Sequence, residues 1–176
     1  MQTAYLLLGS NLGDSGEYLA GALADIATSV GEVVGVSGVY RTAPWGVTNQ
    51  PDYLNQAVAV RTALPPHELL ATVLGIEAAL GRVRLERWGA RVIDIDIILY
   101  GSFATHIDTP TLQIPHPRLH ERRFALLPML EVATALPDLV RIRSAEGSVG
   151  GGLSGELRSR ISECSPATSP FRSLPL

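Results

Sequence analysis

The segment V-I-D-I-D-I-I-L-Y at residues 92–100 places the strongest constraint on the fold. Its β-branched and almost wholly apolar composition predicts a buried β-strand. Alternate residues of a strand share a face, so Asp94 and Asp96 are expected to project together, with Cα atoms about 6.5–7 Å apart. The residues expected to project the other way, into the core, are Ile93, Ile95, Ile97 and Leu99. Two adjacent carboxylates on so apolar a strand repel each other unless a cation or an Arg side chain compensates their charge.

Hydrophobic periodicity and turn residues predict the remaining elements. Strands are expected at residues 3–8, 32–41 and 53–62, with a turn at residues 9–13. Helices are expected at residues 15–30, 66–80 and 121–135, and a short hairpin-like segment near residues 103–107. The order β-α-β-β-α-β-α predicts an α+β sandwich with a mainly antiparallel sheet.

The length and composition bound the organisation of the chain. Its 176 residues suffice for one ordinary domain and are too few for two. From residue 144 the composition shifts to Gly, Ser and Pro, which predicts a domain at residues 1–143 and a flexible tail at residues 144–176. No apolar run approaches the roughly 20 residues of a membrane span, and the single Cys164 fits a reducing cytosol. We therefore expect a cytoplasmic protein without a membrane partner, and we expect it to be a monomer.

All fourteen basic residues are Arg, and the chain contains no Lys. The absence of Lys excludes a P-loop, which needs a Lys on the β- and γ-phosphates, and it excludes Schiff-base chemistry. The net charge of −3 argues against a nucleic-acid partner. Any phosphate must therefore be held by Arg, by a metal ion or by backbone N–H groups.

The loop before the carboxylate pair gives that pair a chemical context. Hard carboxylate oxygens suit Mg²⁺, which completes its shell with water and substrate phosphates. The loop at residues 82–91 carries Arg82, Arg84, Arg87 and Arg91, with Trp88 among them. Guanidiniums beside a carboxylate pair are suited to a polyphosphate–Mg²⁺ complex. Three alternatives stay open: the carboxylates pair with Arg at a sheet end, the loop is only solvated, or Trp88 stacks on a nucleic-acid base.

Two further segments offer ligand contacts. In Q-P-D-Y-L-N at residues 50–55, Tyr53 and Asn55 share a strand face. An aromatic ring beside a carboxamide can stack a flat heterocycle and read its hydrogen-bonding edge. In the segment I-P-H-P-R-L-H-E-R-R-F at residues 114–124, His116 and Arg122 offer donors to phosphate. No Ser-His-Asp, Cys-His or zinc-ligand spacing stands out.

Taken in order, these motifs resemble those of the 6-hydroxymethyl-7,8-dihydropterin pyrophosphokinases. The motifs that carry the resemblance are G-S-N-L-G-D, Y-R-T-x-P-x-G, Q-P-D-Y-L-N, G-R-V-R-x-x-R-W-G-x-R, D-I-D-I-I-L-Y-G and I-P-H-P-R-L-x-x-R-x-F. The similarity extends from about residue 6 to about residue 130. It implies a three-layer α+β sandwich related to the ferredoxin-like arrangement.

The resemblance also implies a reaction and its ligands. The expected enzyme is a Mg²⁺-dependent diphosphotransferase of folate biosynthesis. It would transfer the diphosphoryl group of ATP to the hydroxymethyl group of 6-hydroxymethyl-7,8-dihydropterin, giving AMP and the pterin diphosphate. Asp94 and Asp96 would hold two Mg²⁺ ions around the triphosphate, and Trp88 would close over the site on a mobile loop. The expected ligands are thus ATP and the pterin, without nucleic acid.

By the same resemblance, each remaining site residue receives a role. The implied ATP-binding residues are Glu77, Arg82, Arg84, Trp88, Arg91, His116 and Arg122. The implied pterin-binding residues are Thr42, Ala43, Trp45, Tyr53, Asn55 and Phe124, with Tyr53 and Phe124 on either side of the ring. The implied catalytic set is Arg82, Arg84, Trp88, Arg91, Asp94 and Asp96.

Two other function classes remain to be distinguished from this one. The carboxylate pair also suits a two-metal phosphohydrolase or nucleotidyltransferase. A non-catalytic nucleotide- or RNA-binding module is the third possibility. The reaction product separates the three, because only the pyrophosphokinase forms AMP in a pterin-dependent manner.

Overall fold

The computed structural model describes residues 1–44, 49–83, 89–102, 105–117, 119, 123–134 and 172–173. The elements in chain order are β1 (Gln2–Ser10), α1 (Ser15–Ser29), β2 (Glu32–Val36), β3 (Tyr40–Thr42), β4 (Tyr53–Thr62), α2 (Pro66–Ala79), β5 (Asp94–Tyr100), β6 (Ile107–Asp108), β7 (Gln113–Ile114), α3 (Arg123–Thr134) and β8 (Arg172–Ser173). The expected strand at residues 32–41 is thus two strands, and the short hairpin, β6–β7, lies later than residues 103–107.

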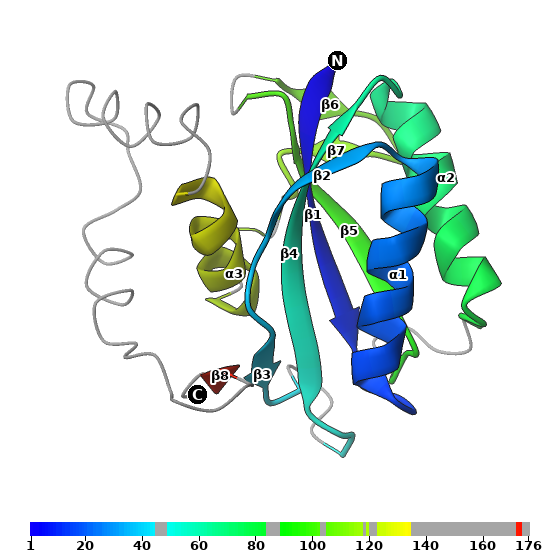
Figure 1. Ribbon diagram of the computed structural model, residues 1–176, viewed down its shortest axis with the longest axis vertical. Coiled ribbons are helices and arrows are strands. Elements are labelled where there is room, and N and C mark those ends of the chain that lie inside the picture. Colours follow the sequence, from blue (N-terminus) through cyan, green and yellow to red (C-terminus); the bar gives the residue numbers. More distant parts are fainter. Residues whose placement is uncertain are drawn as a thin grey trace.

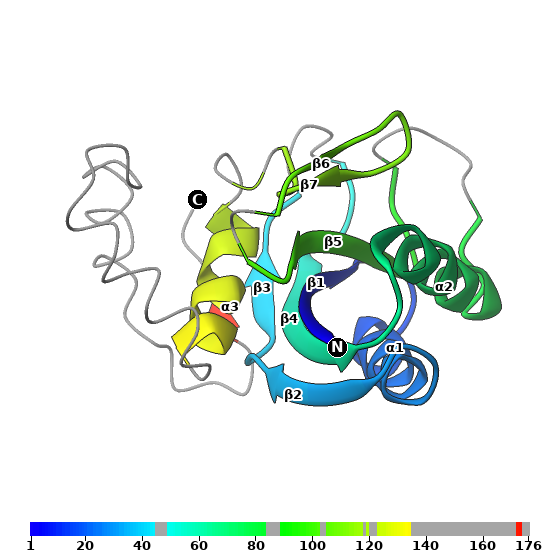
Figure 2. The ribbon, with the colours of Figure 1, turned by 90° about the horizontal axis from the view of Figure 1, so that it is seen from above.

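The main sheet has the strand order β5-β1-β4-β3-β8, and β2 pairs with β4 beside β3. Every pair in it is antiparallel except β3–β8. Helices α1 and α2 cover one face and α3 covers the other, so the domain has three layers (Figures 1 and 2). The predicted α+β sandwich with a mainly antiparallel sheet is confirmed.

Each helix packs through an apolar stripe that its sequence sets. Helix α1 begins after Asp14, whose carboxylate accepts a hydrogen bond from the Glu17 N–H at 3.1 Å. The buried residues of α1 recur at helical spacing and are Leu19, Ala22 and Ile26. Helix α2 begins at Pro66, where a missing N–H costs no hydrogen bond, and it buries Leu69, Val73 and Ile76. These side chains form one core with the sheet, and α3 forms a second core on the opposite face.

Strand β5 confirms part of the expected alternation and contradicts the rest. Ile93, Ile95 and Ile97 are buried in the core under α1 and α2, as expected. Leu99 lies in the opposite core, under α3. The cause is an irregularity in the β1–β5 pairing, where Leu6 pairs with Ile97 but Tyr5 pairs with Leu99. Because β5 has one extra residue at this point, the side chains after Ile97 project to the opposite faces from those expected. The hydrophobic pattern of the sequence gives no sign of this bulge.

Strand β1 extends further than the sequence predicts. Gly9 and Ser10 were expected in a turn, yet both lie in the strand and pair regularly with Asn55 and Leu54 of β4. The neighbouring strand β4 begins at Tyr53, so long-range pairing outweighs the local turn preference of Gly and Ser. This extension brings the end of β1 beside the carboxylates of β5.

Two predictions about the chain as a whole have different outcomes. In the described residues, no helix is long and apolar enough to cross a membrane. Residues 135–171 and 174–176 lie outside the described residues, so the flexible tail at residues 144–176 stays a prediction. The pair Arg172–Ser173 forms β8, parallel to β3.

Candidate active site

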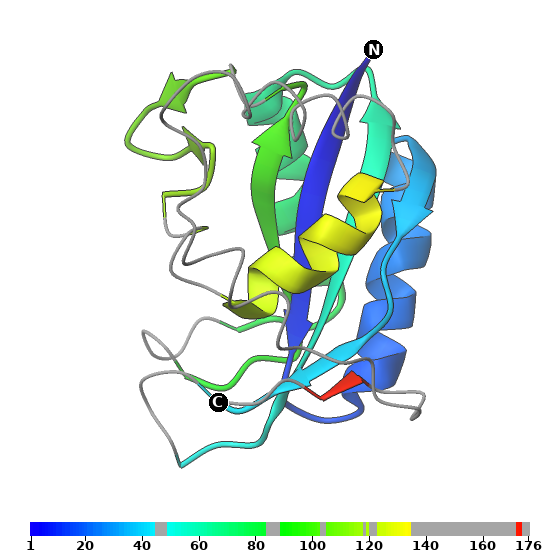
Figure 3. The ribbon, with the colours of Figure 1, turned by 90° about the vertical axis from the view of Figure 1, so that its left-hand side faces the viewer.

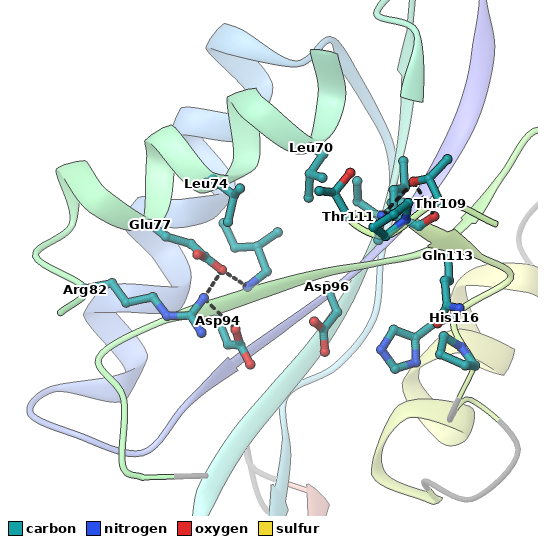
Figure 4. A pocket seen from close by; sticks show the side chains of 15 residues that line it. Leu70, Leu74, Glu77, Arg82, Asp94, Asp96, Thr109, Thr111, Gln113 and His116 are labelled. Carbon is teal, nitrogen blue, oxygen red and sulfur yellow. Dashed lines mark hydrogen bonds and ion pairs between the residues drawn. The ribbon is translucent and has the colours of Figure 1, made fainter. Parts of the chain in front are cut away.

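Asp94 and Asp96 lie at the beginning of β5, the edge strand of the sheet. Asp94 pairs with Gly9 and Asp96 with Leu7. Because paired residues share a face, both carboxylates project to the α3 side of the sheet. Figure 4 shows the two side chains projecting together from β5. The predicted juxtaposition is therefore present, and both residues are half-buried.

Two guanidiniums compensate the charge of Asp94. Arg82 Nη1 lies 2.6 Å from Asp94 Oδ1, and Arg91 Nη1 lies 2.5 Å from Asp94 Oδ2. Arg82 also pairs with Glu77, so it bridges helix α2 and strand β5 (Figure 4). This is the Arg pairing that the sequence left open as an alternative. Each carboxylate oxygen has a second acceptor site, so the pairing leaves Asp94 able to bind a cation as well.

Glu77 is a buried carboxylate that closes the open edge of β5. The residue is 2% exposed, and Oε1 accepts a hydrogen bond from the Ile95 N–H at 2.7 Å. That N–H belongs to an edge strand and would otherwise lack a partner in the sheet. Burial raises the pKa of Glu77, and the Ile95 hydrogen bond and the charge of Arg82 oppose this shift. The geometry gives Glu77 a structural contact, while its implied ATP-binding role stays a prediction.

The raised pKa of Glu77 predicts a pH-dependent contribution to stability. A carboxyl whose pKa is higher in the folded state contributes stability that is fully present below the unfolded value of about 4.3. That contribution is lost as the pH rises through the folded value. Denaturant unfolding measures the free energy of unfolding of wild type and of Glu77→Gln. As the pH falls from about 8 to about 4.5, the free energy of wild type should rise relative to that of Glu77→Gln. If the difference in free energy of unfolding between wild type and Glu77→Gln did not depend on pH, the raised pKa of Glu77 would be contradicted.

A pocket of about 390 Å³ lies along the edge of β5. Helix α2, the first residues of β5 and the β6–β7 hairpin surround it (Figure 4). The lining residues are Leu70, Leu74, Glu77, Arg82, Asp94, Ile95, Asp96, Ile97, Thr109, Pro110, Thr111, Leu112, Gln113, His116 and Pro117. One side of the pocket is therefore apolar and formed by α2, and one end is charged and formed by the carboxylates. Five of the predicted residues meet here: Glu77, Arg82, Asp94, Asp96 and His116.

A second group of predicted residues lies on the α3 side of the sheet. Asn55 Nδ2 donates a hydrogen bond to Thr42 Oγ1 at 2.9 Å, and both residues are buried. Tyr53 lies two residues before Asn55 on β4, and its hydroxyl donates to the Gly89 carbonyl at 3.4 Å. Burial raises the pKa of Tyr53, and the nearby charge of Arg91 opposes the shift. Ala43 follows β3 and is exposed.

Asn11 is a site residue that sequence reasoning missed. It is 3% exposed, and its Nδ2 donates to Gln50 Oε1 at 3.0 Å and to the Pro51 carbonyl at 3.1 Å. Its Oδ1 accepts from the Arg91 N–H at 2.9 Å. Asn11 thus ties the segment before β4 to the segment before β5. The signal is its place in the G-S-N-L-G-D motif, which indicated a turn and supported the family resemblance but gave Asn11 no role of its own.

Several predicted site residues lie outside the described residues. These are Trp45, Arg84, Trp88 and Arg122. Phe124 lies in α3, but its side chain is not among those described. The roles assigned to these residues, and closure of the loop around Trp88, stay predictions.

Comparison with known proteins identifies the family. Residues 5–134 match the family described as 7,8-dihydro-6-hydroxymethylpterin-pyrophosphokinase (HPPK). The chain belongs to the HPPK family. It is 51% identical over 141 residues to the 2-amino-4-hydroxy-6-hydroxymethyldihydropteridine pyrophosphokinase of Methylorubrum extorquens, covering 80% of this chain and 86% of that protein. It is 44% identical over 130 residues to the protein of the same name from Bacillus subtilis, covering 73% and 77%.

A solved structure supports the fold of this HPPK family member. The wild-type HPPK-DHPS of Plasmodium falciparum has a TM-score of 0.58 at 16% identity. The similarity covers 83% of this chain and 44% of that one. The chain thus spans less than half of the larger protein. At this identity the likeness concerns the fold alone, and it agrees with the expected ferredoxin-like-related sandwich.

Proposed function

We propose that this HPPK family member transfers the diphosphoryl group of ATP to the hydroxymethyl group of 6-hydroxymethyl-7,8-dihydropterin in folate biosynthesis. The observation that carries the proposal is the position of Asp94 between two regions. Asp94 lines the pocket at the edge of β5, and across the sheet it pairs with Gly9, which in turn pairs with Asn55. A donor nucleotide in the pocket and an acceptor beside Asn55 would therefore meet at the carboxylates.

The reaction joins the two substrates at the β-phosphorus. The pterin hydroxymethyl oxygen forms a bond to the β-phosphorus and loses its proton, while the bond to the α,β-bridging oxygen breaks and AMP leaves. The active site must hold the two reacting atoms in line and compensate the phosphate charge. Arg82 and Arg91 are held beside Asp94 by ion pairs, so their guanidiniums are pre-positioned to donate to phosphate oxygens as well.

The carboxylate pair fits Mg²⁺, the proposed cofactor. Asp94 and Asp96 provide hard oxygen ligands on one strand face and both line the pocket. Within the described ranges, no group of three or more His, Cys, Asp or Glu side chains gathers around a common point. Two carboxylates leave most coordination positions to water and phosphate oxygens, as Mg²⁺ with a nucleotide requires. When bound, the ion would neutralise the phosphate charge and orient the triphosphate.

Asn55, Thr42 and Tyr53 would hold the pterin. The Thr42 hydrogen bond fixes the Asn55 amide, so that Oδ1 can accept from a ring N–H. Tyr53 provides an aromatic surface on the same strand face. Polar recognition of an edge by Asn55 together with ring stacking on Tyr53 suits a flat heterocycle.

The test of this function is product formation with and without the pterin. The purified chain should form AMP from MgATP only when 6-hydroxymethyl-7,8-dihydropterin is present. Release of ADP or phosphate without the pterin would indicate a phosphohydrolase. The absence of turnover with both substrates would indicate a binding module, and either result would contradict the proposal.

Replacement of Tyr53 tests the pterin site separately from the ATP site. Tyr53→Ala should weaken pterin binding by about 1–3 kcal/mol, the range of aromatic–base stacking, and leave ATP binding nearly unchanged. Calorimetric titration with each substrate measures both affinities. Tyr18→Ala on α1, which removes a half-buried ring from another part of the fold, serves as the control. Equal losses for pterin and ATP in Tyr53→Ala would assign the ring to the fold.

A further inference from the structure

Gly9 occupies a position where glycine is unexpected on structural grounds. It lies in β1 and pairs regularly with Asn55 on one side and Asp94 on the other, so no bulge requires it. Its φ angle is not among the positive ones, so any residue could adopt its backbone conformation. A glycine inside a strand loses conformational entropy and packs no side chain. In the absence of a backbone reason, such a glycine marks a close approach by another group.

No core side chain of the described residues fills the space above Gly9. A Cβ atom built on Gly9 would have a single described heavy atom within 4 Å, Asn55 Oδ1 at 3.3 Å. Gly35 of β2 provides a contrast on the same face of the sheet. A Cβ on Gly35 would meet Val132 Cγ1 at 3.3 Å and Ala59 Cβ at 3.7 Å, both in the α3 core. Gly35 thus makes room for the protein's own packing, whereas Gly9 adjoins no core side chain of the described residues.

The polar atom beside this space, Asn55 Oδ1, has no hydrogen-bond donor among the described residues. Asn55 is 2% exposed, and its Nδ2 donates to Thr42. In the described part of the chain, its Oδ1 accepts no hydrogen bond. A buried acceptor without a partner costs free energy, which a ligand N–H would recover. Figure 3 shows that α3 crosses β1 and β4 away from the C-terminal end of β1, where Gly9 lies.

We propose that Gly9 is a specificity-determining residue of the acceptor site. Gly9 lies between Asn55 and Asp94 and has no side chain, so the acceptor can contact its Cα directly where it crosses β1. The ligand would be a flat heterocycle with an N–H directed at Asn55 Oδ1 and an alcohol directed at Asp94. A side chain at residue 9 would occupy the volume of the acceptor. The pocket along the edge of β5, which lies beyond β5 as seen from Gly9, would be unaffected. This inference rests on the proposed function, because the acceptor is the substrate named there.

Gly9→Ala and Gly35→Ala form a matched pair for the test, since both introduce a methyl group at 3.3 Å from one neighbouring atom. Calorimetric titration would use the pterin with a non-hydrolysable ATP analogue and Mg²⁺. Gly9→Ala is expected to weaken pterin binding at least about 10-fold while changing the affinity for the analogue less than about 2-fold. Gly35→Ala is expected to leave both affinities near wild type. The Tm of Gly9→Ala should fall no further than that of Gly35→Ala.

A double mutant separates a ligand effect from a displaced Asn55. If the new methyl group only displaces the Asn55 amide, Gly9→Ala should have no further effect on pterin binding in an Asn55→Ala background. If it occupies the acceptor volume, as we propose, the pterin affinity should fall again by a similar factor. The inference would be overturned if this further loss of affinity were absent, or if Gly9→Ala bound the pterin as tightly as wild type. It would also be overturned if Gly9→Ala lowered the Tm and weakened the binding of both ligands. Failure of the proposed function would instead appear in wild type, as no pterin-dependent formation of AMP.

Discussion

Asp96→Ala is expected to lower kcat by a factor of at least about 100 with ATP and pterin saturating. The reason is that Asp96 would contribute a metal ligand whose value is greatest when negative charge develops on the transferring phosphates. Asp94→Ala should cause a similar loss, because Asp94 also orients Arg82 and Arg91. Steady-state kinetics at several Mg²⁺ concentrations measures the effect.

Measurement of Tm shows whether the loss of kcat in the two carboxylate variants is catalytic or results from unfolding. Asp96→Ala relieves repulsion with Asp94, so its Tm should hold or rise. Asp94→Ala should not gain stability in this way, because it leaves Arg82 and Arg91 without their common partner. Asp108→Ala, at an exposed residue of β6, is the control and should keep the wild-type kcat. A kcat near wild type in Asp96→Ala would contradict the metal assignment.

Arg82→Ala is expected to destabilise the fold by about 3 kcal/mol and to lower kcat as well. The Arg82 side chain is 11% exposed and that of Glu77 is 3% exposed, so the variant leaves a buried carboxylate without its counter-charge. Urea unfolding measures the loss. Arg61→Ala removes a pair with Glu32 whose side chains are 49% and 63% exposed, and it should cost only about 0–1 kcal/mol.

A double mutant locates the origin of that loss. Glu77→Gln removes the buried charge but keeps an acceptor for the Ile95 N–H, so Arg82→Ala should cost less in the Glu77→Gln background. The kinetic loss from Arg82→Ala should persist in that background, because we propose that Arg82 donates to the phosphates of ATP. A destabilisation by Arg82→Ala no larger than that by Arg61→Ala would contradict the account of a buried ion pair.

The sequence predicted those parts of the fold that depend on local periodicity. The stripes of α1 and α2 and the alternation of β5 up to Ile97 follow directly from residue spacing. The reversal at Leu99 and the extension of β1 through Ser10 do not, because both depend on pairing with distant strands. Local preferences for turn residues at Gly9 and Ser10 were outweighed by contacts that one sequence does not reveal.

The candidate site was predictable where its residues share one strand. Asp94 and Asp96, like Tyr53 and Asn55, were grouped correctly because alternate strand residues share a face. The proximity of these two pairs required knowledge of the sheet order, in which β1 lies between β5 and β4. The contacts of Asn11 with Gln50 and Arg91 span separate segments and were not foreseeable from spacing.

We expect the diphosphoryl group to move as an intact unit, and phosphorus NMR of the reaction mixture tests this transfer most directly. With MgATP and 6-hydroxymethyl-7,8-dihydropterin, the spectrum should show AMP and a pterin-bound diphosphate appearing in equal amounts as ATP disappears. The two phosphorus signals of the new product should be coupled to each other. Formation of ADP with a pterin monophosphate, or of AMP with free pyrophosphate and unmodified pterin, would contradict the account.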